Sequence, residues 1–268
     1  MTVTFSSCWY NFKAKFDNST YLKWIDNMLS NVNNYNLVVY CDNSSKKDLE
    51  KYESNPRIKI IVKPHNQFYN YKYRENWILN HEKNEKLKDW IDWKVNMLWC
   101  EKVHFVYDTL INKYFDTEFY GWCDIGYFRN RACDLSTETL MTWPNPNIIN
   151  SLNKEKVYYG CIQNNGDYMN KLTSEISNRN EYGLPKNPIS IDQTSIAGGF
   201  FIAHKDKVPR WREIFDEKLA LYFKHKYLVK DDQMIIIDCM FSHIHDFFIC
   251  REYDSRYDIW FMFQRLLL

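Results

Sequence analysis

"NLVVYCDNSSKKDLEKYESNPRIKIIVKP", residues 36–64, is the stretch that decides the fold. The apolar run 36–42 predicts a buried strand, the polar run 46–53 predicts a short helix, and the run 57–64 predicts a second strand that stops at Pro64. Strands that alternate with helices are typical of parallel sheets whose faces are covered by helices. The stretch therefore predicts a βαβ unit.

The flanking sequence continues this alternation in both directions. "VTFSSCWY" at 3–10 predicts a first buried strand, and 21–32 has helical spacing, so the N-terminal part reads βαβαβ. Further helices and strands are predicted downstream: helices over 93–114, 208–227 and 231–243, and strands over 118–128, 157–163, 194–206 and 247–253. We therefore expect an α/β fold with a mixed, mostly parallel central sheet and helices on both faces, in a single domain over 1–268.

Two polar segments interrupt the pattern. Residues 65–93 are polar, aromatic and basic and predict an insertion or lid, whereas 164–192 are rich in turn residues and predict a surface excursion. The first segment offers side chains that could stack on sugars: Tyr69, Tyr71, Tyr73, Arg74 and Trp77. The alternative is a solvated insertion packed by its own aromatic residues.

Composition narrows the classes of function. The 268 residues include 35 basic and 34 acidic side chains, a net charge of +1, which argues against a general electrostatic nucleic-acid binder. Aromatic residues make up 18 % of the chain. This content allows ring-lined sites for sugars or bases, although an aromatic core explains it equally well.

The eight cysteines are scattered, form no CxxC pair, and fall partly in apolar runs. This distribution predicts free thiols and a reducing, cytoplasmic compartment. We expect no signal peptide and no transmembrane segment, because no apolar run approaches the roughly 18 residues that a spanning helix needs. The apolar segment 258–268 is predicted to dock on the body of the protein, with a peripheral membrane or partner contact as the alternative.

Asp124 is the most unusual residue of "YGWCDIGYF", 120–128, which otherwise reads as a buried strand. A buried carboxylate needs a cation, a metal or several hydrogen-bond donors. Ligands of open α/β sheets bind at the carboxyl ends of the strands. Asp124 is therefore a candidate to hold a divalent metal that clamps a diphosphate, with Gly126 allowing close backbone approach. The alternative is an aspartate that only caps a turn.

A pair of glycines, Gly198 and Gly199, interrupts the strand-like run 195–203. Glycine inside a strand marks a bulge or a group packed against the backbone. A bound sugar ring is one such group, and a plain bulge is an equal alternative.

Acidic residues open the predicted helix over 231–243. Asp231, Asp232 and Gln233 either complement the helix dipole or present a carboxylate to a reacting hydroxyl as a general base. At the end of the same helix, His243 or His245 is a candidate third ligand for a metal held by Asp124. Histidines without a ligand role are the alternative.

The chain resembles a nucleotide-sugar glycosyltransferase of the GT-A fold. The resemblance lies in the order of its elements: the strand "TFSSCWY", then "WCDIG", "AGGFF" and "DDQ", and a late histidine. The segments "MLWCEKVHFV" and "WCDIGYFR" are most similar to the YibB/HtrL group of bacterial proteins. The resemblance implies a Rossmann-like GT-A domain, a nucleoside-diphosphate sugar donor that is most often uridine-linked, and a hydroxyl of a glycan or other acceptor. It leaves inversion or retention open.

The resemblance also implies residue roles. Asp124 matches one half of the family's D-x-D element, which binds Mn²⁺ or Mg²⁺ and the donor diphosphate, whereas Trp122 and Gly126 depart from it. The other implied contacts are Phe5, Ser6 and Ser7 with base and ribose, Lys102 and Arg129 with the diphosphate, Gly198 and Gly199 with the donor sugar or acceptor, and Asp232 and Gln233 with the transferred sugar.

Two other classes stay open. The missing half of D-x-D suits a non-catalytic carbohydrate- or nucleotide-binding protein on a decayed scaffold. A nucleotidyltransferase also uses an α/β sheet with carboxylates, but the sequence lacks a glycine-rich phosphate loop near residue 10.

Overall fold

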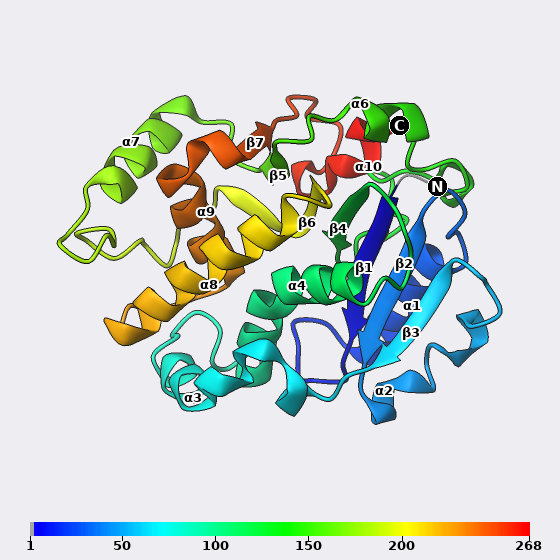
Figure 1. Ribbon diagram of the computed structural model, residues 1–268, viewed down its shortest axis with the longest axis horizontal. Coiled ribbons are helices and arrows are strands. Elements are labelled where there is room, and N and C mark those ends of the chain that lie inside the picture. The colour runs from blue at the N-terminus through cyan, green and yellow to red at the C-terminus, as the bar shows by residue number, and fades with distance from the viewer. Residues whose placement is uncertain (1–2) are drawn as a thin grey trace.

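Seven strands form one mixed sheet within residues 3–268, the part of the chain that the computed structural model describes. They are β1 (Val3–Trp9), β2 (Asn36–Cys41), β3 (Ile58–Val62), β4 (Phe119–Cys123), β5 (Val157–Cys161), β6 (Ile196–His204) and β7 (Phe247–Cys250). Their order is β3-β2-β1-β4-β6-β5-β7 (Figure 1). β6 is antiparallel to β4 and β5, and the other pairings are parallel, which confirms the predicted mixed, mostly parallel sheet.

The predicted βαβαβ unit is present at the N-terminus. α1 (Asn18–Leu29) joins β1 to β2, and α2 (Asn43–Lys46) with η1 (Glu50–Tyr52) joins β2 to β3. Side-chain caps fix where these helices begin: Asp17 accepts from the Thr20 amide and Asp42 from the Ser45 amide. The single helix expected over 46–53 is therefore wrong: α2 begins earlier, at the Asp42 cap, and a separate short helix, η1, follows it.

Helices cover both faces of the sheet. α4 (Trp93–Ile111) and α8 (Val208–Lys224) cross in front of it in Figure 1, next to α9 (Asp232–Ser242). Alternate residues of β6 point to opposite faces, so Phe201 joins the core under α4, α8 and α9, whereas Phe200 joins the core that includes Met28 of α1. One apolar core therefore lies on each face of the sheet, and the prediction of helices on both faces is confirmed.

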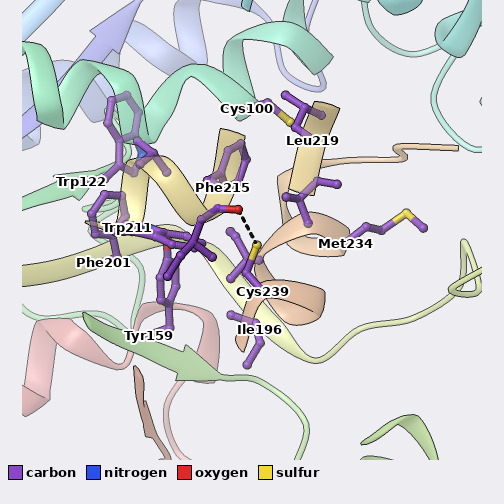
Figure 2. Packing of buried hydrophobic residues seen from close by; sticks show 14 of the residues in the cluster. Cys100, Trp122, Tyr159, Ile196, Phe201, Trp211, Phe215, Leu219, Met234 and Cys239 are labelled. Carbon is purple, nitrogen blue, oxygen red and sulfur yellow. Dashed lines mark hydrogen bonds between the residues drawn. The ribbon is translucent and has the colours of Figure 1, made fainter. Parts of the chain in front are cut away.

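Figure 2 shows the first of these cores from close by. Trp122 and Phe201 of the sheet belong to the same cluster as Trp211 and Phe215 of α8. The Cys239 thiol of α9 donates to the Ile214 carbonyl of α8 at 3.7 Å. This packing fixes α9, and with it the acidic residues at its N-terminus, against the sheet.

The two polar segments are folded. Residues 65–93 form η2 (His65–Gln67), η3 (Tyr69–Tyr73) and α3 (Arg74–Glu82), and 164–192 contain α7 (Gly166–Ser177). Trp77 is fully buried, donates to the Asn70 carbonyl and packs edge-on against Phe223 of α8. Trp77 is therefore a core residue and is not available to stack on a sugar.

The C-terminal segment docks on the body of the protein, as expected. It contains η5 (Ile259–Phe261) and α10 (Phe263–Leu266), and the remaining short helices are α5 (Thr137–Leu140), α6 (Pro146–Ser151) and η4 (Ile244–Asp246). Phe263 stacks on Phe200 at 4.5 Å, and Gln264 donates to the Tyr127 carbonyl at 2.7 Å. All eight cysteines are free. Among the described residues, no helix is long and apolar enough to cross a membrane.

Candidate functional site

A pocket of about 440 Å³ opens at one edge of the sheet. The carboxyl ends of β1 and β4, the start of β6 and the N-terminus of α9 meet there, because β6 runs opposite to its neighbours. Its lining includes nine of the predicted site residues: Lys102, Asp124, Gly126, Arg129, Gly198, Gly199, Asp231, Asp232 and Gln233. The pocket thus has the position at which open α/β sheets bind ligands.

Asp124 stands directly after β4 and faces this pocket. Its amide donates to the Gly199 carbonyl at 2.9 Å, which continues the sheet pairing and fixes the backbone. Its Oδ1 accepts from the Trp122 indole at 2.6 Å and lies 3.2 Å from Lys102 Nζ, while 42 % of the side chain is exposed. One carboxylate oxygen is therefore held by the protein and the group still reaches the pocket.

Lys102 is the buried centre of the site. It comes from α4, is 6 % exposed, and donates to the Gly198 carbonyl at 2.8 Å. Its ammonium also lies 3.2 Å from Asp124 Oδ1 and 3.1 Å from Asp232 Oδ2. Burial lowers the pKa of Lys102, but the two carboxylates raise it more, so the net pKa lies above its usual value. The side chain stays charged at neutral pH.

Asp232, the first residue of α9, is 5 % exposed and shares this one ammonium with Asp124. Burial raises the pKa of Asp232 to about 6, against the lowering effect of Lys102 and with smaller raising effects from Asp231 and Asp124. At neutral pH the group is mostly a carboxylate, yet it takes up a proton more readily than a solvent-exposed aspartate. This is the property expected of a general base.

The double glycine makes space for these two carboxylates. A Cβ at position 198 would lie 2.7 Å from Asp232 Oδ2, and one at position 199 would lie 3.1 Å from Asp124 Oδ2. Gly126 likewise leaves space for a neighbouring side chain, because a Cβ there would lie 2.7 Å from the Trp24 ring. All three glycines line the pocket, but their immediate neighbours are protein side chains.

Two more cations line the pocket. The Arg129 guanidinium lies 4.2 Å from the centre of the Trp24 ring and 4.8 Å from that of Phe261, and its Nε donates to the Gly126 carbonyl at 3.1 Å. Lys15, in the loop after β1, lies 5.1 Å from the centre of the Trp99 ring. Within residues 3–268 neither side chain forms an ion pair with a carboxylate, so both are available to an anion.

Aromatic rings form much of the remaining wall: Trp9, Tyr10, Phe12, Phe16, Tyr21, Trp99, Trp122, Tyr127, Trp260 and Phe261. Flat rings of this kind suit stacking against a base or the apolar face of a sugar. Sequence reasoning missed Lys15 and most of these rings. The signal for Lys15 and Phe16 was their place just after the first strand, whereas Trp260 reaches the pocket only through the docking of the C-terminus.

The structure does not bring the predicted base and ribose contacts to the pocket. Phe5, Ser6 and Ser7 are fully buried in the middle of β1. Phe5 packs between Trp143 and Phe200, and Ser6 Oγ lies 2.8 Å from Thr109 Oγ1. The strand continues to Trp9, so the residues that reach the pocket are those at its end.

Asp231 and Gln233 flank Asp232 in the pocket wall. Asp231 pairs with Lys230 Nζ at 3.2 Å, and its Oδ1 is buried without a hydrogen-bond partner among the described residues. The side chain does not cap α9. This unpartnered oxygen is suited to accept a hydrogen bond from a bound molecule.

His243 and His245 lie at the other end of α9, outside the pocket. Helix geometry places His243 roughly 16 Å from Asp232. In the described part of the chain, no group of three or more His, Cys, Asp or Glu side chains could hold a metal ion. The predicted ligand set of Asp124, His243 and His245 is therefore not brought together, because the helix separates its members.

No family model and no curated protein sequence matches the chain. Among solved structures, it is similar to a 4-diphosphocytidyl-2C-methyl-D-erythritol synthase from Anaerococcus prevotii DSM 20548. The two chains are 10 % identical, the match covers 96 % of this chain and 91 % of the other, and the TM-score is 0.42. A likeness of this level says nothing about the chemistry of the pocket.

Proposed function

We propose that the chain is a glycosyltransferase that moves a sugar from a nucleoside-diphosphate sugar, with uridine as the leading base, to a hydroxyl of a glycan or other acceptor. The observation that carries this proposal is the buried ammonium of Lys102, which joins Asp124 and Asp232 at the floor of a ring-lined pocket. Lys15 and Arg129, which pair with no carboxylate in the part of the chain that the structure describes, also line the pocket.

The donor diphosphate is assigned to Lys15 and Arg129. As the bond between the anomeric carbon and the β-phosphate oxygen breaks, its electron pair leaves with the nucleoside diphosphate. Fixed cations close to that oxygen stabilise the charge where it develops. Arg129 is held in place by Trp24 and Phe261, so little ordering is needed when the anion binds.

Asp232 is assigned the role of general base. The acceptor oxygen forms the new bond to the anomeric carbon while its proton passes to the Asp232 carboxylate. A pKa of about 6 leaves this group ionised at neutral pH and still basic enough to accept the proton. One displacement with a base on the acceptor side inverts the anomeric centre, so the anomer of the product tests this assignment.

The test is a panel of nucleotide sugars, each first scored by thermal shift and then by release of nucleoside diphosphate with mono- and oligosaccharide acceptors. We expect one donor to raise the melting temperature by mass action and to be consumed. Binding without release for every acceptor would replace the proposal by the non-catalytic carbohydrate- or nucleotide-binding protein. If no nucleotide sugar binds, the proposal fails.

A nucleotidyltransferase is the second candidate. It is favoured by the loop after β1, which carries Lys15 into the pocket, where a triphosphate would need a cation. The loop contains no glycine, and the first glycine of the chain is Gly121, so no glycine-rich loop can wrap phosphates there. Pyrophosphate release from a nucleoside triphosphate would favour this candidate over glycosyl transfer.

A further inference from the structure

We infer that the resident cation between Asp124 and Asp232 is the ammonium of Lys102, and that this site therefore binds its donor without a divalent metal ion. The inference rests on the proposed function for the identity of the donor. The placement of the Lys102 ammonium between the two carboxylates rests on geometry alone. It departs from the sequence-based expectation that Asp124 holds Mn²⁺ or Mg²⁺.

The Lys102 ammonium lies between the two carboxylates of the pocket floor. A lysine ammonium has three N–H donors and no acceptor. Three acceptors surround Lys102 Nζ: the Gly198 carbonyl at 2.8 Å, Asp232 Oδ2 at 3.1 Å and Asp124 Oδ1 at 3.2 Å. The ammonium thus donates one hydrogen bond to the backbone and forms an ion pair with each carboxylate, and it takes the place between the two carboxylates that a bridging metal would need.

The described residues around Lys102 do not form a group of metal ligands. Mg²⁺ and similar hard cations require several oxygen ligands at roughly 2.0–2.2 Å. Oδ1 of Asp124 is already engaged by the Trp122 indole and by Lys102, which leaves its Oδ2. Nowhere in residues 3–268 do three His, Cys, Asp or Glu side chains gather that could hold a metal, and the two carboxylates of the pocket floor have the Lys102 ammonium between them.

Trp122 stands where an acidic residue would complete D-x-D. Its indole N–H orients Asp124, and its ring centre lies 5.8 Å from Lys102 Nζ. A second acid at this position would add a ligand for a metal. The indole instead supports the ammonium from its apolar side and holds the carboxylate toward it.

Removing the ammonium should turn the site into a metal site. In Lys102→Ala, two carboxylates face each other across the space that Nζ occupied, which is the arrangement that binds a divalent cation. We would titrate Mn²⁺ into the wild-type protein, Lys102→Ala and Lys102→Ala/Asp124→Asn, and measure free Mn²⁺ by electron paramagnetic resonance. Lys218→Ala is the matched control, since Lys218 is a buried lysine that pairs with an aspartate outside the pocket.

We expect no stoichiometric Mn²⁺ uptake by the wild-type protein or Lys218→Ala, about one equivalent by Lys102→Ala, and its loss again in the double variant. Uptake of one equivalent by the wild-type protein that disappears in Asp124→Asn would overturn the inference. Failure of Lys102→Ala to fold without Mn²⁺ but rescue of its melting temperature by the ion would support it.

The wild-type protein gives a second test that needs no variant. Calorimetric binding of UDP and of the nucleotide-sugar panel is measured in EDTA and again in Mn²⁺. We expect dissociation constants that agree within about twofold, because fixed cations hold the phosphates. Binding only in Mn²⁺ would overturn the inference. If no nucleotide binds in either buffer, the proposed function fails, whereas the Mn²⁺ titration still decides the role of Lys102.

Discussion

α9 carries two buried aspartates with very different surroundings. Asp238, in the second half of the helix, is fully buried and is contacted by Arg179, by Lys218 Nζ at 3.0 Å and by the Tyr222 hydroxyl at 2.8 Å. Asp232, at the start of the helix, pairs within residues 3–268 with Lys102 alone, and the same ammonium also pairs with Asp124. Asp238 thus pairs with two cations, whereas Asp232 shares one cation with Asp124.

The difference suits Asp238 to stabilising the fold and Asp232 to exchanging a proton. A buried carboxylate with two cations and a hydroxyl is tied down, and removing one partner costs stability. A buried carboxylate that is short of positive charge has a raised pKa, here about 6, and can exchange a proton near neutral pH. Only the second aspartate lines the pocket. Substitutions at Lys102, Asp232 and Gly198, and the pH dependence of the rate, test this difference between the two aspartates.

Lys102→Met should have the largest effect. It leaves two carboxylates together at the pocket floor with no cation, so we expect the rate of sugar transfer to fall by about 10³-fold and the unfolding free energy to fall by about 3 kcal/mol. Initial rates corrected for the folded fraction and urea unfolding measure the two losses. Lys218→Met is the control, with a loss of stability and an unchanged rate per folded molecule. Equal rates in the Lys102→Met and wild-type proteins would remove Lys102 from the site.

Asp232→Asn should abolish the base and preserve the fold. The amide keeps the shape but cannot accept the proton, so we expect kcat to fall by about 10²-fold or more while donor binding changes little. Asp238→Asn is the matched change on the same helix, and there we expect a stability loss of about 3 kcal/mol with kcat unchanged. Comparing kcat and the urea midpoint of both variants tests the contrast. A large loss of kcat in Asp238→Asn alone would reverse it.

Gly198→Ala tests whether the glycine exists for Asp232. The added methyl would lie 2.7 Å from Asp232 Oδ2, so it must push the carboxylate away from Lys102. We expect kcat to fall by about tenfold and stability to fall by about 1–3 kcal/mol. Gly166→Ala is the control, since nothing lies within 4 Å of its added methyl. Wild-type kinetics for Gly198→Ala would show that the position of Asp232 is not tightly required.

The pH profile gives the smallest effect. Asp232 accepts a proton only as the carboxylate, so kcat/KM should rise with pH, about tenfold per unit, and level off above about 6. Initial rates between pH 4.5 and 8 would locate the inflection. The inflection should disappear in Asp232→Asn and persist in Asp238→Asn. An inflection near 4, the ordinary value for aspartate, would mean that another carboxylate controls the rate.

Local sequence patterns predicted much of this structure. Apolar runs between helical stretches predicted the βαβαβ unit, and a lone carboxylate at a strand end predicted the place of Asp124. Gly198, Gly199 and Asp232, which the resemblance assigned to the sugar, line the same pocket, because α/β topology brings strand ends and helix starts to one edge.

Other features depend on contacts that no local pattern encodes. The shared ammonium joins α4, the end of β4 and α9, whose residues are far apart in the chain, so the sequence did not show that Lys102 lies between Asp124 and Asp232. His243 was grouped with Asp124 because both are ligand types, but the length of α9 separates them. The base contacts expected of Phe5, Ser6 and Ser7 were misplaced along β1, since the sequence does not show how far a buried strand extends before it meets the pocket.

The most direct test of the central claim is nucleoside diphosphate release from the nucleotide-sugar panel in EDTA, by the wild-type protein and by Asp232→Asn. We expect that the wild-type protein consumes one donor without metal, and that the variant binds this donor equally well but releases the diphosphate at least about 10²-fold more slowly. Equal rates in the two proteins, or no release from any donor by the wild-type protein, would contradict it.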